Sequence, residues 1–135
     1  MIRQIMLSTA LMFLLMPVIG YAAELPGLPE SLVIKALAGE AGGQSEAELI
    51  AHAHAIANRG HLKGVYGLRA KVSATALKRA KLAYAKSRLV PDTVNGADHW
   101  LSDYDLRHSM ASLIAWRHKA VYRVKVGSTT FYRLK

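Results

Sequence analysis

The first helix that the pattern of apolar residues predicts carries a carboxyl group on its apolar side. It begins at Glu30 or Ser31 and ends at Gly42-Gly43, because consecutive glycines break a helix. Three apolar residues and one glutamate share one side of it at helical spacing: Val33, Ala36, Leu37 and Glu40. Apolar surroundings favour the protonated form of a carboxyl group, which is the form that a general acid uses. A last-turn glutamate that points into solvent is the alternative that the pattern leaves open.

Two further helices follow. Ser45 and Glu48 have the spacing of a capping box, so the second helix starts there and runs to Arg59, with Gly60 as its C-terminal stop. The third helix spans residues 74–87, and three of its side chains are predicted to face inward while its lysines face outward: Leu77, Ala80 and Tyr84.

The C-terminal part mixes turn, helix and strand signals. Residues 91–100 are rich in turn formers and are predicted to be irregular. A fourth helix is predicted from about residue 105 to residue 118, burying Leu106, Met110, Leu113 and Ile114. Residues 122–126 and 129–133 alternate in polarity around Gly127-Ser128, which predicts a β-hairpin. The fold class is therefore α+β, mainly helical, with one small C-terminal hairpin.

The first 23 residues have the form of a signal peptide. Arg3 gives a positive start, an apolar run extends from residue 5 to residue 19, and small residues allow cleavage after Ala22 or Ala23. The run is short for a membrane span and contains Pro17, although an uncleaved anchor is the alternative. We therefore expect an exported protein, periplasmic or secreted, with no stable membrane span after cleavage. Residues 24–135 are enough for one domain.

Composition narrows the chemistry and the partners. The chain has no cysteine, which excludes a thiol nucleophile. Beyond residue 23 it carries 17 basic and 9 acidic residues, a net charge of +8. Nine of the basic residues occur between Glu48 and Asp92, where there is no acidic residue. Such a surface attracts anionic cell-wall polymers or lipid. Nucleic acid is not an expected partner of an exported chain without a binding motif, and a solvated basic face remains an alternative.

No pattern in the sequence matches a metal site, a serine nucleophile or a nucleotide-binding loop. His52 and His54 lie about 200° apart around a helix, so they cannot share an ion there. We expect His54 to pack in a groove with Ile50 and Asn58, and His52 to lie at the helix surface. No His-Glu-x-x-His, Gly-x-Ser-x-Gly or P-loop motif is present. We therefore expect neither a metal nor a cofactor.

Acid catalysis on a glycosidic bond remains. It needs one protonated carboxyl group and usually a second carboxylate. Besides Glu40, the candidates for that second group are Asp92, Asp98, Asp103 and Asp105. Asp98 adjoins His99 and Trp100, and a tryptophan suits either stacking on a sugar or packing in a core.

Four segments in order resemble the cell wall hydrolases typified by the spore-cortex-lytic enzyme catalytic domain. They are LAGEAGGQ (37–44), AIANR (55–59), DTVNGADHW (92–100) and VGSTTFYR (126–133). The resemblance implies a lysozyme- or transglycosylase-like domain that cuts peptidoglycan glycan strands at N-acetylmuramic acid. It implies that Glu40 is the general acid. The residues of these segments that we expect to bind the glycan are Gln44, Asn58, Asp98, His99, Trp100 and Tyr132.

The resemblance also suggests how a single carboxyl group could suffice. In a lytic transglycosylase the C6 hydroxyl of muramic acid attacks intramolecularly, and a 1,6-anhydro sugar results. If Asp98 instead directs water, the product is a reducing sugar. The chain departs from the family in a short loop at residues 64–72 and in Leu101-Ser102, where the family often has asparagine. The alternatives are a non-catalytic basic protein that binds cell wall or membrane, and a cell-wall amidase.

Overall fold

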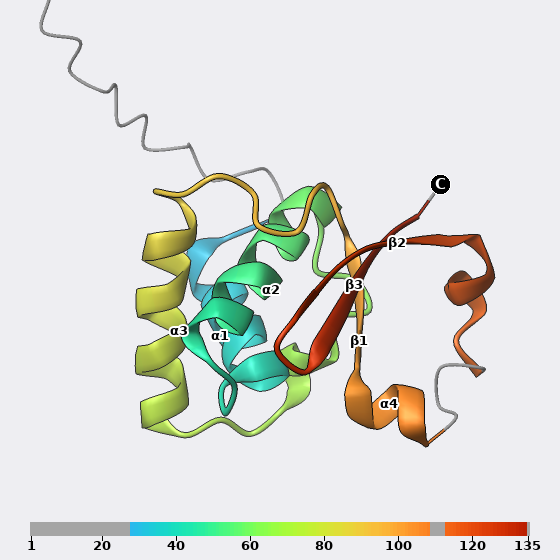
Figure 1. Cartoon of the computed structure of the whole chain (residues 1–135). Coiled ribbons are helices and arrows are strands. Elements are labelled where there is room, and N and C mark those ends of the chain that lie inside the picture. The colour runs from blue at the N-terminus through green and yellow to red at the C-terminus, as the bar shows by residue number, and fades with distance from the viewer. Residues whose placement is uncertain (1–27, 109–112, 135) are drawn as a thin grey trace, which may run out of the picture.

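The computed structural model describes residues 28–108 and 113–134 (Figure 1). The signal peptide predicted over residues 1–23 lies outside the described residues, and so does Met110 of the predicted fourth helix. Within the described part, four α-helices and a three-stranded antiparallel sheet form a mixed α+β fold, which confirms the predicted class. No helix in these two ranges is both long and apolar enough to cross a membrane.

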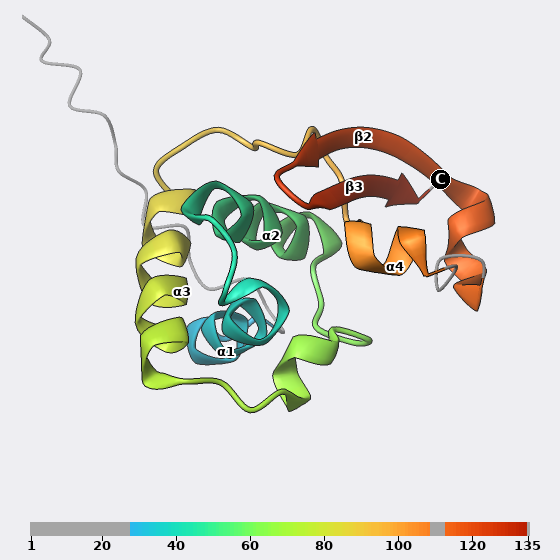
Figure 2. The same ribbon diagram turned by 60° about the horizontal axis from the view of Figure 1, so that its bottom comes forward.

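Three helices form the helical half of the molecule, and their bounds confirm the predicted ones closely. Helix α1 spans Glu30–Ala41, α2 spans Glu46–Arg59 and α3 spans Ala74–Ser87. The Ser45 side chain accepts a hydrogen bond from the first turn of α2, and Gly60 closes that helix with φ at 74°. Local capping signals therefore determine both ends of α2. Figure 2 shows the three helices beside one another, with the sheet and α4 on the other side of the molecule.

Small side chains allow the three helices to pack closely. Leu37 and Ile56 are fully buried among alanines of all three helices. Of the three residues predicted to face inward on α3, Ala80 is fully buried, Tyr84 is half-buried, and Leu77 is 38% exposed. The prediction for Leu77 is therefore wrong, because alanines form the inner face of α3 and leave the larger side chain at the rim.

The C-terminal half is an antiparallel sheet in the order β1-β3-β2. Strands β2 (Ala120–Val126) and β3 (Thr129–Leu134) form the predicted hairpin around Gly127-Ser128. Strand β1 (His99–Ser102) pairs with the other side of β3. The last two residues of the segment predicted to be irregular therefore belong to a strand, and β1 becomes an edge of the sheet.

The predicted fourth helix over residues 105–118 is wrong. Helix α4 covers only Asp103–Arg107, starting from a capping box between Ser102 and Asp105. A 3₁₀ helix, η3, follows at Ala115–Lys119, and the extended backbone of Ile114 precedes it. The apolar spacing misled the prediction because these side chains do not enter a core: Leu113 is 82% exposed and Ile114 is half-buried.

One aromatic ring and one buried carboxylate join the two halves. Phe131 of β3 is fully buried against Ala51 and Ala55 of α2. The Glu48 carboxylate is also buried and accepts a hydrogen bond of 2.6 Å from the backbone N–H of Ser128 in the hairpin turn. Glu48 therefore does not close the reciprocal capping box that its spacing predicts, because its side chain binds the hairpin instead.

Two glycines bring α1 against a short 3₁₀ helix, η1 (Tyr66–Arg69). A Cβ atom on Gly39 would lie 2.0 Å from the carbonyl oxygen of Gly67, and one on Gly67 would lie 2.3 Å from the carbonyl oxygen of Ala36. The two backbones touch directly, and therefore no residue larger than glycine fits at either position. This contact fixes where the Gly67 N–H points.

Gly39→Ala is expected to destabilise the fold, because the added methyl group must displace the backbone of Gly67. Overpacking of this kind costs about 1–3 kcal/mol, which outweighs the gain of about 1 kcal/mol from alanine in a helix. Gly43→Ala is the matched control, since a Cβ there meets nothing within 4 Å. Urea unfolding followed by circular dichroism measures both. Equal free energies of unfolding for the two variants would contradict the close contact.

Candidate active site

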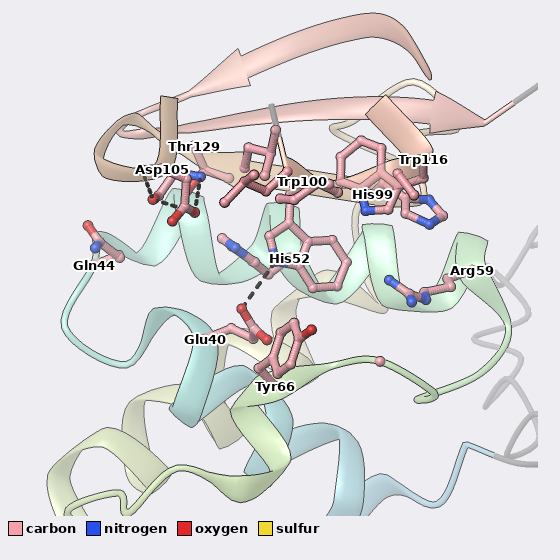
Figure 3. Close-up of a pocket in the computed structure, with 16 residues that line it drawn as sticks. Glu40, Gln44, His52, Arg59, Tyr66, His99, Trp100, Asp105, Trp116 and Thr129 are labelled. Atoms are coloured by element: carbon pink, nitrogen blue, oxygen red, sulfur yellow. Dashed lines mark hydrogen bonds between the residues drawn. The ribbon is translucent and has the colours of Figure 1, made fainter. Parts of the chain in front are cut away.

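A cleft of about 730 Å³ lies between the helical half and strand β1 (Figure 3). One wall consists of residues from α1, α2 and the segments that follow them: Glu40, Gln44, His52, Arg59, Gly64 and Tyr66. The opposite wall is formed by all of β1, by Asp105, Thr129 and by residues 113–116. Aromatic and polar side chains therefore face each other across the cleft.

Glu40 lies in the last turn of α1 with its carboxyl group in the cleft (Figure 3). Its Oε1 atom accepts a hydrogen bond of 2.8 Å from the backbone N–H of Gly67. Its Oε2 atom accepts one of 3.2 Å from the indole N–H of Trp100. Each oxygen is thus held by a donor from a different segment, and the half-buried carboxyl group has a fixed direction.

Trp100 combines the two roles between which its sequence context could not decide. Its ring packs against the cores of both halves and also lines the cleft. The ring of His52 meets it edge-on, with ring centroids 5.3 Å apart. The Arg59 guanidinium lies over it, 5.8 Å from the ring centroid. Trp100 is therefore a rigid wall beside Glu40.

His52 is buried, with 2% of its surface exposed, so its predicted place at the helix surface is wrong. Trp100 and Phe131 of the sheet cover that side of α2. The His52 Nδ1–H donates to the carbonyl oxygen of Glu48 at 2.8 Å. Burial lowers the pKa of His52, although that hydrogen bond and the charges of Glu40 and Glu48 act in the opposite direction. The ring is therefore neutral at pH 7.

His54 and Asn58 hold a loop rather than line the cleft. The His54 Nε2–H donates to the carbonyl oxygen of Ser87 at 2.7 Å, and its Nδ1 accepts from the backbone N–H of Thr93 at 3.0 Å. The Asn58 amide donates to a carboxylate oxygen of Asp92 and to the carbonyl oxygen of Ala97, each at 3.0 Å. Both residues attach the loop before β1 to α2.

Asp92 organises the same loop. Burial acts to raise the pKa of Asp92, but hydrogen bonds from the backbone of Val94 and Gly96 and from Asn58 outweigh it and lower the pKa. The carboxylate accepts from these two N–H groups at 2.8 Å and 2.7 Å. Asp92 thus acts as the turn residue that its sequence context suggests, and positions the start of β1.

Of the other predicted site residues, some line the cleft and some lie behind it. Gln44 and His99 line it. Asp98 does not: its carboxylate accepts from His99 Nδ1 at 2.9 Å and from the backbone N–H of Leu134 at 3.0 Å. Tyr132 also lies outside the lining, and its ring packs 5.8 Å from that of Trp116.

The cleft is also lined by residues that were not predicted as binding residues, among them Arg59, Tyr66, Asp105 and Trp116. Asp105 had been considered only as a possible second carboxylate. Arg59 follows Asn58 within one of the four motifs, which is the signal that could have identified it. Tyr66 and Trp116 stand in a glycine-bounded loop and in a wrongly predicted helix, so their direction could not be read from periodicity.

Comparisons of the chain with models of known protein families, with curated proteins and with solved structures give no match. Among the described residues, no group of three or more histidine, aspartate or glutamate side chains could hold a metal ion. The geometry by itself defines an open cleft with aromatic walls and a carboxyl group fixed between them.

Lowering the pH below about 6.5 is expected to destabilise the protein through His52. An unfolded chain binds a proton at this histidine near pH 6.5, whereas the buried ring does so only at lower pH. The unfolded state then binds more protons than the folded state. The free energy of unfolding therefore decreases as the pH is lowered, by up to about 1.4 kcal/mol per pH unit. Well above pH 6.5, where neither state binds this proton, the contribution is constant.

Urea unfolding between pH 5 and pH 7.5 measures this dependence. His52→Gln should reduce the slope below pH 6.5, whereas His61→Gln, at an exposed position, should keep it. A slope in His52→Gln that equals that of the unsubstituted protein would rule out the assignment.

Proposed function

We propose that the protein is an exported enzyme that cleaves the glycan strand of peptidoglycan at N-acetylmuramic acid, with Glu40 as general acid and base. The observation that carries this proposal is the carboxyl group of Glu40, held in the cleft by the N–H groups of Gly67 and Trp100. The ordered motifs that resemble the cell wall hydrolases add support, because five of their residues besides Glu40 line the same cleft: Gln44, Arg59, His99, Trp100 and Thr129.

The walls of the cleft suit a polysaccharide. Sugar rings present apolar C–H faces that stack on aromatic rings, and hydroxyl and amide groups that need hydrogen-bond partners. Tyr66 is 79% exposed, and Trp100 and Trp116 line the cleft. Gln44 and Ser102 add polar groups. We also propose a lysozyme-like architecture, supported by a glutamate at a helix end that faces an antiparallel sheet across a cleft.

In the proposed reaction Glu40 works in both directions. Its proton passes to the glycosidic oxygen as the bond from that oxygen to C1 of muramic acid breaks. The resulting carboxylate then takes the proton of the C6 hydroxyl while O6 forms a bond to C1. The N–H groups of Gly67 and Trp100 support the carboxylate between the two steps, since hydrogen bonds to a charged acceptor are the stronger kind.

The remaining carboxylates favour the 1,6-anhydro product. Asp98, the predicted candidate for directing water, does not line the cleft. Asp105 does line it, but its Oδ2 atom accepts from both the backbone N–H and the hydroxyl of Ser102 in the capping box of α4. Among the described residues, Glu40 is thus the one carboxyl group of the cleft that is not committed to a helix cap.

The basic surface supplies the attachment to the wall in this proposal. Lys78 and Lys81 are exposed on α3, the helix on the side of the molecule away from the sheet (Figure 2). Lys86 on the same helix pairs with Glu46 at 2.8 Å. Cations in this region attract anionic polymers at long range, and this attraction weakens as the salt concentration increases.

Glu40→Gln is expected to lower the release of soluble fragments from purified peptidoglycan by about 10²–10⁴-fold, the usual contribution of a general acid. Glu46→Gln is the matched control, because Glu46 is an exposed glutamate outside the cleft. Turbidity clearing and chromatography of the released fragments measure both variants, and circular dichroism checks their folding. Undiminished release of fragments by a folded Glu40→Gln variant would rule out the catalytic role of Glu40.

Mass spectrometry of the fragments is expected to show 1,6-anhydromuramic acid ends, because no second carboxylate that is free to direct water lines the described part of the cleft. Asp105→Asn should leave both the product and its rate within a few fold of the unsubstituted protein. Reducing ends that disappear in Asp105→Asn would instead establish hydrolysis with Asp105 as base. Released peptides without cut glycan would indicate an amidase. Salt-sensitive binding with no released fragments would indicate a non-catalytic binding protein.

A further inference from the structure

Arg59 is the only lysine or arginine among the described residues that line the cleft. It is the last residue of α2, and its guanidinium extends along the cleft wall toward Trp100 (Figure 3). The long basic run of the sequence therefore places one cation inside the cleft, whereas Lys78 and Lys81 are exposed elsewhere.

The surroundings of Arg59 fix its direction without neutralising it. Its Nη2 donates to the carbonyl oxygen of Lys63 at 2.6 Å, and the turn through Gly64, with φ at 77°, returns the chain toward it. Within the part of the chain that the structure describes, Arg59 forms no ion pair. Its Nε–H is buried and has no hydrogen-bond partner in residues 28–108 and 113–134.

These conditions leave a charged group with capacity for an anion. Burial lowers the pKa of Arg59, and the charges of Asp98 and Glu40 act in the opposite direction. An arginine nevertheless stays protonated near neutral pH. Its Cζ atom lies over the Trp100 ring, and its Nη1 group donates to no other described residue, so these donors can form the fork that suits a carboxylate. A partly buried cation without a counter-ion is a position that an anionic ligand would stabilise.

We propose that Arg59 binds a carboxylate of the glycan substrate and so makes the enzyme select anionic strands over neutral ones. This inference rests on the proposed function. The sugar ring that stacks on Trp100 would carry this carboxylate beside Glu40. The carboxylate has two chemical sources: the lactyl group of muramic acid in a strand without peptides, or the peptide stem attached to that group.

Three substrates distinguish the lactyl group from the peptide stem as the source of the carboxylate. One is glycan with its peptide stems, the second is glycan stripped of peptides so that the lactyl carboxylate is free, and the third is stripped glycan whose carboxylates are converted to methylamides. The kcat and KM values of the unsubstituted protein, Arg59→Gln and Arg59→Lys are measured on each. Lys35→Gln removes the same charge from an exposed position outside both the cleft and the basic run of residues 59–88, and serves as the control.

Arg59→Gln is expected to raise KM about 10- to 100-fold on the substrate that carries the recognised carboxylate, the usual range for a lost charge-assisted hydrogen bond. Its kcat should change little, and its KM on the methylamide substrate should equal that of the unsubstituted protein. Arg59→Lys should recover part of the loss. A loss on the stripped glycan identifies the lactyl group, and a loss on the peptide-bearing glycan alone identifies the stem.

Calorimetric titration of the same oligosaccharides into Glu40→Gln, with and without Arg59→Gln, tests binding separately from cleavage. If no substrate is cut by the unsubstituted protein, the proposed function fails while the carboxylate preference is still measured. If Arg59→Gln does not fold, the preference of the unsubstituted protein for carboxylate over methylamide decides. Equal affinity for these two substrates, or an equal effect of Arg59→Gln on both, overturns the inference.

Discussion

The direct contact between the backbones of α1 and η1 is the constraint from which the geometry of the cleft follows. Gly39 and Gly67 leave no space for a side chain between them. The contact brings the N–H of Gly67 to one oxygen of Glu40, and Trp100 reaches the other oxygen from the sheet. A carboxyl group at the end of a helix would otherwise choose among several rotamers. Here its direction depends on two residues far away in the sequence.

A second constraint sets the distance between the walls. The buried carboxylate of Glu48 holds the hairpin turn, and a Cβ atom on Gly127 would lie 1.7 Å from its Oε1 atom. The apolar contact between the halves is small, because Phe131 packs mainly against alanines. Hydrogen bonds to a buried charged acceptor therefore contribute to keeping β1 opposite α1, and a buried carboxylate that lost them would remain costly to desolvate.

Local signals explain what the sequence could predict. Helices α1, α2 and α3 and the β2–β3 hairpin have their own stop residues, caps and turn residues, so their bounds could be predicted without knowing what they pack against. Residues 113 and 114 have helical spacing but line a cleft, and His52 lies on a polar-looking face that the sheet covers. These errors share one cause, since only the tertiary arrangement decides which apolar or polar surface is covered.

The residues of the candidate site also fall into those that the sequence could predict and those that only the tertiary arrangement reveals. The place of Glu40 at the end of an apolar stripe could be read from the sequence. For Trp100 the sequence left stacking on a sugar and packing in a core as alternatives. The positions of Asn58 and Asp98 behind the cleft could not be predicted, because each is drawn away by partners on other elements, Asp92 and Leu134. The role of Arg59 could not be predicted, because its place in a basic run of the sequence does not distinguish it and only the folded structure shows its neighbours.

The two tryptophans of the chain, Trp100 and Trp116, both line the cleft. The tryptophan fluorescence of the protein consequently originates from these two residues of the cleft and from no other part of the chain. One indole is hydrogen-bonded to Glu40, and the other packs beside His99 with ring centroids 4.8 Å apart. Their emission can therefore report the occupancy of the cleft in solution, without a label and without any change to the sequence.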